Sequence, residues 1–246
     1  MKDEVLCVIP ARGGSKGIPS KNIQKICGKP LIQYTIETAK NSKLISRIII
    51  STDSEKIAKI ARKLGVEVPF MRPKKISNDY AVQYDVVKHA TKVLAEKESY
   101  SPEIIIVLQP TSPIRSSKMI DKSINFLKKG KSTSVISVSK VKSHPDIIFQ
   151  QNWKYLKPLN KNFEKHSIRQ TQSKLYGPTG SIYTFWNKTL ENYNSIYGSR
   201  IKPLIIKENE FNIDIDTPFD LFIAQMTILH WKQFKQKFEN IKKYWL

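Results

Sequence analysis

The sequence predicts an α/β fold: a Rossmann-like, three-layer αβα arrangement in which helices cover both faces of a mostly parallel sheet. Short apolar runs at residues 4–10, 46–52 and 103–109 are almost uninterrupted, which is typical of strands buried on both faces. Longer segments with helical spacing separate these runs. Alternating strands and helices, joined by right-handed crossovers, build a parallel sheet, and ligands bind beyond the carboxyl ends of its strands.

The individual helices have recognisable ends. Pro30 suits the first turn of a helix, Asp53 can cap the next helix, and Gly65 stands where that helix would end. We expect helices at residues 30–40, 54–64, 80–98, 117–129 and 218–230. In addition to the three apolar runs, we expect strands at residues 66–68, 134–139, 181–186, 203–206 and 211–215.

The alternation lapses at about residues 140–187, a polar and turn-rich stretch that is too long for an idle loop. We interpret it as an arm inserted into a single domain that spans residues 1–246. Residues 231–246 predict a basic amphipathic helix that packs on the body or on a partner, with contact to a membrane surface as the less favoured alternative. The arm carries aromatic residues of the kind found at interfaces, so it either crosses to a second subunit or closes as a lid; these are Phe149, Trp153, Tyr155 and Phe163.

The composition fits a globular protein and argues against several other classes. Of the 246 residues, 40% are hydrophobic, which is enough for a sizeable core, and no apolar run is long enough to cross a membrane. Cys7 and Cys27 offer neither a disulfide framework nor a zinc motif, and the four histidines lack metal-ligand spacing. We therefore expect a cytoplasmic location.

The formal net charge of +21 has three interpretations. A nucleic-acid binder is one of them. The basic residues are spread along the chain, however, which favours solvated lysines on helix faces such as Lys56, Lys59 and Lys63. A positive field would also speed the arrival of anionic substrates at an enzyme.

The strongest motif is the glycine-rich loop at residues 11–22, which follows the first buried strand directly. Glycine lets the backbone approach a phosphate chain, and the cations Arg12, Lys16 and Lys21 can neutralise a triphosphate and a departing pyrophosphate. The spacing matches neither a P-loop nor the dinucleotide-binding fingerprint. The alternative, a solvent-exposed basic turn, is disfavoured by the position of the loop after a strand.

A pair of aspartates forms the second motif. In an extended strand, Asp214 and Asp216 would share one side while Ile213 and Ile215 face the core. Two carboxylates side by side favour a bound cation, and Mg²⁺ is the natural one because it bridges carboxylates and phosphates. The alternative is that Asp216 only caps the following helix.

Two further loops carry weaker evidence. Gln109 ends a buried strand and begins a stiff, proline-rich turn at residues 109–115. Arg72 precedes a turn at residues 77–79 that either contacts a base or ribose or is an ordinary capped loop. No arrangement of Ser, His, Asp and Cys suggests a covalent intermediate.

Taken in this order, the motifs at residues 9–22, 72–73, 108–115 and 214–216 resemble those of the acylneuraminate cytidylyltransferase family, which contains the CMP-sialic acid synthetases and related enzymes for other nonulosonic acids. The resemblance spans about residues 4–229. It implies a nucleotidyltransferase fold, CTP and a nonulosonic acid as substrates, Mg²⁺ as cofactor and a homodimer.

The resemblance also implies roles for individual residues. The phosphates and ribose of CTP would lie against Arg12, Gly13, Gly14, Ser15, Lys16, Lys21 and Asn22, with Arg72 and Gln83 nearby. The sugar acid would meet Gln109, Arg169, Thr179 and Tyr183. Asp214 and Asp216 would bind Mg²⁺, and the residues expected to act in catalysis are Arg12, Lys21 and Asp216.

One position departs from the family pattern. Relatives usually carry Asn where this chain has Thr179, ahead of Tyr183. Because Thr offers one hydroxyl in place of an amide, we expect that N-acetylneuraminic acid is not the best substrate, and that legionaminic or pseudaminic acid reacts faster. The rival functions are a nucleotidyltransferase for another sugar, such as Kdo, and a basic nucleotide- or RNA-binding module without catalysis.

Overall fold

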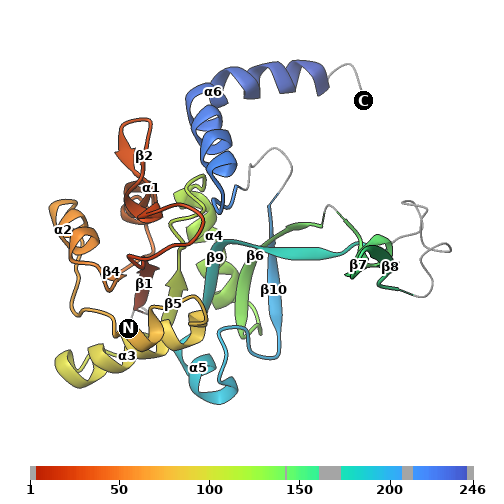
Figure 1. Ribbon diagram of the computed structural model, residues 1–246. Helices are drawn as coiled ribbons and strands as arrows, with labels where there is room; N and C mark the ends of the chain where they lie inside the picture. The colour runs from red at the N-terminus through yellow and green to blue at the C-terminus, as the bar shows by residue number, and fades with distance from the viewer. Residues whose placement is uncertain (1–3, 142, 161–172, 207–212, 243–246) are drawn as a thin grey trace.

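The computed structural model describes residues 4–141, 143–160, 173–206 and 213–242 (Figure 1). A six-stranded sheet forms its centre. The strands, in their order across the sheet, are β10 (Ile201–Ile205), β6 (Ser134–Lys140), β9 (Tyr176–Trp186), β5 (Ile104–Val107), β1 (Val5–Pro10) and β4 (Arg47–Ser51).

The sheet is mostly parallel, as the apolar runs predict. β1 pairs in parallel with β4 and β5, and β10 pairs in parallel with β6. The exception is β9, which runs antiparallel between β5 and β6. β9 also begins earlier than the expected residue 181, because its first residues continue the pairing with the end of β6.

Helices cover both faces of the sheet, which confirms the three-layer prediction. Successive side chains of a strand point to opposite faces of the sheet, so alternate strand residues pack into two separate hydrophobic cores, one on each face. On one face pack α1 (Leu31–Lys40), α2 (Glu55–Lys63) and α4 (Ser117–Lys129). On the other face pack α3 (Gln83–Glu98) and α5 (Asn187–Tyr193).

Several local expectations need correction. Ser54, not Asp53, caps α2, because its side chain accepts from the Ile57 amide. Of residues 66–68, Glu67 alone forms a bridge, to Ile49, so no strand forms there; residues 213–215, the described part of the strand expected at 211–215, are also unpaired. α3 begins at Gln83 instead of residue 80.

A long helix, α6 (Pro218–Lys242), replaces the two C-terminal helices expected from the sequence. Its first half packs on the glycine-rich loop and on the small hairpin of β2 (Lys25–Ile26) and β3 (Lys29–Pro30), where Ala224 meets Ile18 and Ile215. Figure 1 shows that α6 then bends and runs out from the body. Within the described residues, no helix combines the length and the apolar character needed to cross a membrane.

The arm contains a two-stranded hairpin of β7 (Phe149–Asn152) and β8 (Tyr155–Pro158). It projects from the ends of β6 and β9, away from the helical layers (Figure 1). Trp153 and Tyr155 are 76% and 73% exposed, so the apolar surface of the hairpin has no cover within the described chain. Phe163 lies outside the described residues.

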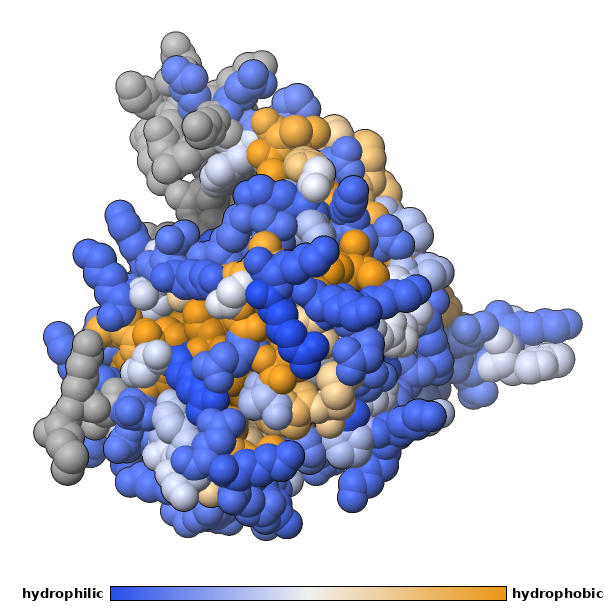
Figure 2. Space-filling model, turned by 90° about the vertical axis from the view of Figure 1, so that its left-hand side faces the viewer, coloured by the Kyte–Doolittle hydropathy of each residue, from blue (hydrophilic) through white to orange (hydrophobic). Residues whose placement is uncertain are grey.

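Lysines on the helix surfaces point into solvent. Lys56, Lys59 and Lys63 of α2 are all exposed, as are Lys40 at the end of α1 and Lys43 just after it. On the face drawn in Figure 2, hydrophilic side chains cover most of the surface. This distribution supports the interpretation of the +21 charge as mainly solvated lysines.

Candidate active site

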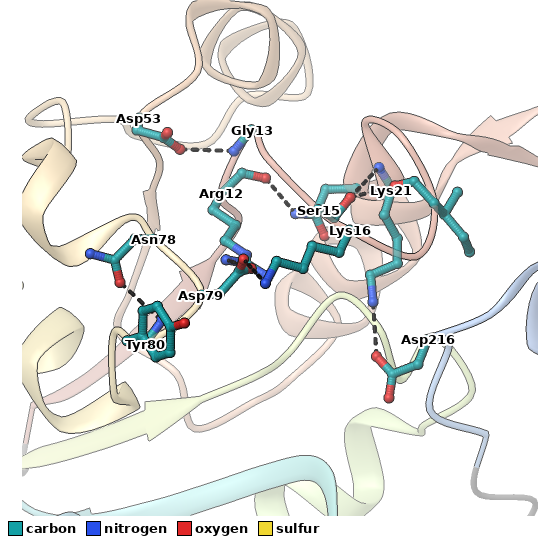
Figure 3. Close-up of polar contacts among 12 residues, drawn as sticks. Arg12, Gly13, Ser15, Lys16, Lys21, Asp53, Asn78, Asp79, Tyr80 and Asp216 are labelled. Carbon is teal, nitrogen blue, oxygen red and sulfur yellow. Dashed lines mark hydrogen bonds and ion pairs between the residues drawn. The ribbon is translucent and has the colours of Figure 1, made fainter.

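The glycine-rich loop leaves β1 at the carboxyl edge of the sheet, where ligands of parallel α/β sheets bind. Figure 3 shows its side chains converging with groups from other loops. The Gly13 amide donates to Asp53 Oδ1 at 2.8 Å, which ties the loop to the end of β4. A side chain at Gly17 would collide with the Asp216 carbonyl oxygen, so glycine is required where the loop meets the acidic segment.

Ser15 and Asn22 shape this loop from within. The Ser15 hydroxyl donates to the Ile18 carbonyl and accepts from the Lys21 amide at 3.3 Å. The buried Asn22 donates through Nδ2 to the Arg12 carbonyl at 2.9 Å. Gly14 is exposed and nothing crowds it, so its backbone is open to a ligand.

An acidic side chain sits between two of the loop cations. Asp79 contacts Arg12 Nη1 at 2.6 Å and Lys16 Nζ at 2.9 Å (Figure 3). Hydrogen bonds from Lys16 and then Arg12 lower the pKa of Asp79 below its ordinary value. The sequence pointed to the 77–79 turn without indicating this contact.

Arg72 is buried beside the same loop. Its Nε donates to Ser77 Oγ at 3.1 Å and its Nη2 lies 3.9 Å from Asp53 Oδ1. Burial lowers the pKa of the guanidinium, and Nη2 has no hydrogen-bond partner within the described residues. An unsatisfied buried donor of this kind is suited to receive a polar ligand atom.

Lys21 connects the loop to the acidic pair. Its Nζ donates to the Ile215 carbonyl at 2.6 Å and to Asp216 Oδ1 at 3.0 Å. Ile215 is fully buried while both aspartates reach the surface, so the alternation expected from the sequence holds although no strand forms. Loss of water around Asp214 is the main reason that its pKa is raised, and the Asp216 charge adds to the shift.

Asp216 does not cap the following helix. Thr217 and Asp220 form a reciprocal cap instead: the Thr217 amide donates to Asp220 Oδ2 at 2.7 Å and the Asp220 amide donates to Thr217 Oγ1 at 3.2 Å. The alternative that Asp216 caps this helix is therefore wrong. The Asp216 carboxylate instead contacts Lys21 and is exposed to solvent.

A second group of polar residues lies across from the cationic loop. Gln109 donates through Nε2 to Gln83 Oε1 at 3.1 Å, so Gln83 contacts the residue expected at the sugar. A side chain on Gly180 would come within 3.0 Å of Gln109 Oε1 and 3.2 Å of Asp214 Oδ2. Burial raises the pKa of Tyr183 to about 12, so the phenol stays protonated.

Two of the expected sugar contacts are not placed in this group. Thr179 is buried, and its hydroxyl donates to Ser137 Oγ at 2.7 Å, inside the sheet. Its hydroxyl is therefore paired with Ser137, and the adjoining Gly180 is the residue that closely approaches Gln109 and Asp214. Arg169 lies outside the described residues.

Arg115 ends the proline-rich motif, but the sequence indicated no role for it. The guanidinium is buried and donates through Nη2 to the carbonyls of Gln109 and Ser112, which closes the proline-rich turn. Burial lowers its pKa to about 9. Its place eight residues beyond the end of β5 gave no indication of burial, because arginine usually stays at the surface.

Fold and site together define a class: α/β proteins in which a cationic glycine-rich loop lies beside a pair of carboxylates at the carboxyl edge of the sheet. Comparison with known proteins gives the family. The family model described as Cytidylyltransferase matches residues 6–243, and the chain belongs to this family. Because this family consists of enzymes, the membership argues against the basic nucleotide- or RNA-binding module without catalysis that the sequence left as a rival function.

Individual relatives resemble the chain over nearly its whole length. It is 36% identical over 227 residues to the post-translational flagellin modification protein B of Campylobacter coli, covering 92% of this chain and 95% of the relative. It is 35% identical over 228 residues to the CMP-N,N'-diacetyllegionaminic acid synthase of Legionella pneumophila, covering 90% and 94%. The solved structure of CMP:2-keto-3-deoxy-manno-octonic acid synthetase complexed with CTP shares the fold, with a TM-score of 0.68 at 18% identity over 92% of this chain and 99% of that one.

Proposed function

We propose that the chain joins CMP from CTP to a nonulosonic acid, a sialic-type sugar acid, and releases pyrophosphate. One observation carries the proposal: Lys21 of the glycine-rich loop contacts Asp216, so cations suited to phosphates and carboxylates suited to a metal ion meet at one edge of the sheet. A CMP-N,N'-diacetyllegionaminic acid synthase among the relatives supports a sugar acid of this kind.

The reaction is an in-line displacement at the α-phosphorus of CTP. The anomeric hydroxyl of the sugar forms the new bond to phosphorus, the bond to the β-phosphate oxygen breaks, and pyrophosphate leaves. Positioning and charge neutralisation supply most of the catalysis in such transfers. Arg12, Lys16 and the amides of the glycine-rich loop would bind the phosphates, and Lys21 with Arg12 would stabilise the charge on the departing pyrophosphate.

The acidic pair fits Mg²⁺. Asp214 and Asp216 offer hard oxygen ligands, and within the described residues no set of three His, Cys, Asp or Glu side chains could hold a metal ion on its own. Two carboxylates are sufficient for Mg²⁺, which usually keeps waters and substrate phosphates as its other ligands. When bound, the ion would neutralise phosphate charge. Asp216, whose side chain is 73% exposed, is the proposed acceptor of the proton from the sugar hydroxyl.

The metal role is tested by Asp214→Asn and Asp216→Asn. Both side chains reach the surface, so we expect folded proteins whose pyrophosphate release falls by about 100-fold or more, with loss of saturable dependence on Mg²⁺. Glu96→Gln, an exposed charge change on α3, is the matched control and should behave as wild type. Wild-type turnover and Mg²⁺ dependence in both aspartate variants would contradict the role.

For the sugar, we propose that legionaminic or pseudaminic acid is preferred over N-acetylneuraminic acid. The legionaminic relative supports this order, whereas Thr179, whose side chain is buried against Ser137, gives it no direct support. Measured kcat/KM values for the three acids and for Kdo test the order directly. Because the Thr179 hydroxyl bonds to Ser137, Thr179→Asn should change the ranking only if it shifts Gly180; a wild-type preference for N-acetylneuraminic acid would overturn the proposal.

The working protein is proposed to be a cytoplasmic homodimer. The exposed aromatic hairpin of the arm supports the dimer. The thiols of Cys7 and Cys27 are unpaired, which suits a reducing compartment. Neither substrate is a nucleic acid, and the positive charge would serve to attract small anions.

A further inference from the structure

The contact between Asp79 and the glycine-rich loop is not required by the proposed reaction. The two carboxylate oxygens are divided between two cations: Oδ1 lies 2.6 Å from Arg12 and Oδ2 lies 2.9 Å from Lys16. Figure 3 shows the carboxylate reaching across to both side chains from the 77–82 loop. A carboxylate that bridges two cations in this way occupies the position that two phosphate oxygens of a ligand would take.

Apart from the ion pairs, the hydrogen bonds of the loop that carries Asp79, among the described residues, join it to Arg72 and to near neighbours in sequence. Ser77 Oγ donates to the Pro73 carbonyl at 3.0 Å, Asn78 Nδ2 donates to the Lys75 carbonyl at 3.0 Å, and the Tyr80 amide donates to Asn78 Oδ1 at 2.9 Å. Tyr80 is 88% exposed, so the tip of the loop has almost no packing to lose if it moves.

We propose that Asp79 is an internal competitor for the phosphate-binding cations: it pairs with Arg12 and Lys16 in the empty enzyme and is displaced when a phosphorylated ligand binds. The inference rests on the proposed function, because it takes Arg12 and Lys16 as phosphate ligands. The lowered pKa of Asp79 supports it, since the carboxylate is charged at neutral pH and competes as an anion.

Competition makes a quantitative prediction. Every ligand that must displace Asp79 loses the same factor of affinity, whereas a ligand without phosphate loses none. Both ion pairs are partly exposed, so the factor is modest, about three- to tenfold. The competitor would limit occupation of the site by pyrophosphate, and its return to the cations would assist release of that product.

The test uses Asp79→Asn, which keeps the shape of the side chain and removes its charge. Dissociation constants for CTP, pyrophosphate and cytidine are measured by calorimetry on the whole protein without sugar acid, so that no turnover occurs. We expect CTP and pyrophosphate to bind about three- to tenfold more tightly, by equal factors, with cytidine unchanged. Inhibition of turnover by pyrophosphate should strengthen by the same factor.

Glu96→Gln is the control for net charge, because it removes one exposed negative charge from α3. Equal tightening in this variant would assign the effect to the overall field and overturn the competition. If wild type binds CTP but Asp79→Asn binds it no more tightly, the competition is overturned and the proposed function stands. Wild type that binds neither CTP nor pyrophosphate would overturn the proposed function together with it.

Discussion

At the scale of single residues, Gly180 is where the parts of the site meet. It lies on β9 with a φ of +72°, a conformation that L side chains rarely adopt. A Cβ there would reach Gln109 Oε1, Asp214 Oδ2 and Ser112 Oγ, which belong to two other segments of the chain. The sequence identified Gln109 and Asp214 in separate motifs, but their proximity depends on the antiparallel insertion of β9, which no local pattern encodes.

Gly180→Ala should impair the enzyme while leaving it folded. The new methyl group must displace Gln109 or Asp214, and the positive φ adds strain of about 1 kcal/mol. We expect kcat/KM for the sugar acid to fall about tenfold or more, with a lower Tm. Gly177→Ala on the same strand is the control, because its Cβ would meet only Val141 Cγ1, at 3.7 Å. Equal activity of the two variants would show that the close approach at Gly180 is unimportant.

Lys21 is expected to act on turnover more than on binding. Its ammonium is held by the Ile215 carbonyl and by Asp216, close to where pyrophosphate would leave. Lys21→Ala should lower kcat by about 100-fold with a smaller change in the KM for CTP, since its charge matters most when the bond breaks. Steady-state kinetics test this prediction, with Lys25→Ala as a control at an exposed lysine. If Lys21→Ala raises the KM for CTP and leaves kcat unchanged, Lys21 acts in ground-state binding instead.

At the scale of elements, the cap of α6 fixes the direction of the acidic pair. Thr217 and Asp220 satisfy each other's backbone amides, and Asp220 also accepts from the Asp216 amide at 3.1 Å. The sequence placed a helix start here but proposed Asp216 as one possible cap. Both residues suit that position, and only the structure decides between them.

Thr217→Ala should cost about 1 kcal/mol in the free energy of unfolding, measured by urea denaturation. Hydrogen bonds from Thr217 lower the pKa of Asp220 in the folded state. This stabilisation is therefore complete above the unfolded-state pKa of Asp220 and is lost as the pH falls through the lower folded-state pKa. Thr217→Ser retains the hydroxyl and should be about as stable as wild type. A Thr217→Ala variant that is as stable as wild type at neutral pH would argue against the cap.

The arm is the element whose role reaches beyond one chain. Its hairpin exposes Trp153 and Leu156 by 76% and 66%, and we expect it to pack on a second copy. Light scattering at micromolar concentration should give a dimer for wild type and a monomer for the double variant Trp153→Glu/Leu156→Glu. Tyr193→Glu, at a half-exposed aromatic on α5, should remain dimeric. A wild-type monomer would favour the lid.

The sequence predicted elements best where one physical cause dominates. Uninterrupted apolar runs identified β1, β4 and β5, because a strand buried on both faces has no polar side. It failed where tertiary contacts decide: β9 inserts antiparallel, and Asp79 reaches cations that lie far from it in sequence. For the site, residue types could be predicted from chemistry, whereas pairings such as Lys21 with Asp216 depend on the fold.

At the scale of the whole molecule, charge and topology serve the same site. The three loops that end β1, β4 and β5 meet at one edge of the sheet, as parallel strands require. The net charge of +21 is spread over the surface, but the cations Arg12, Lys16 and Lys21 lie at this edge, where they would favour anionic ligands. Together with the Cytidylyltransferase match over residues 6–243, these features support transfer of a nucleotide from CTP to an acidic small molecule.

The most direct test of that claim follows the phosphorus atoms. CTP labelled at the α-phosphate, or separately at the γ-phosphate, is incubated with the protein, Mg²⁺ and a panel of legionaminic, pseudaminic and N-acetylneuraminic acids and Kdo. We predict that the α-label appears in a sugar product, that the γ-label appears only in pyrophosphate, and that a legionaminic- or pseudaminic-type acid gives the highest rate. Folded protein that transfers no α-label to any of the acids would contradict the proposed nucleotide transfer.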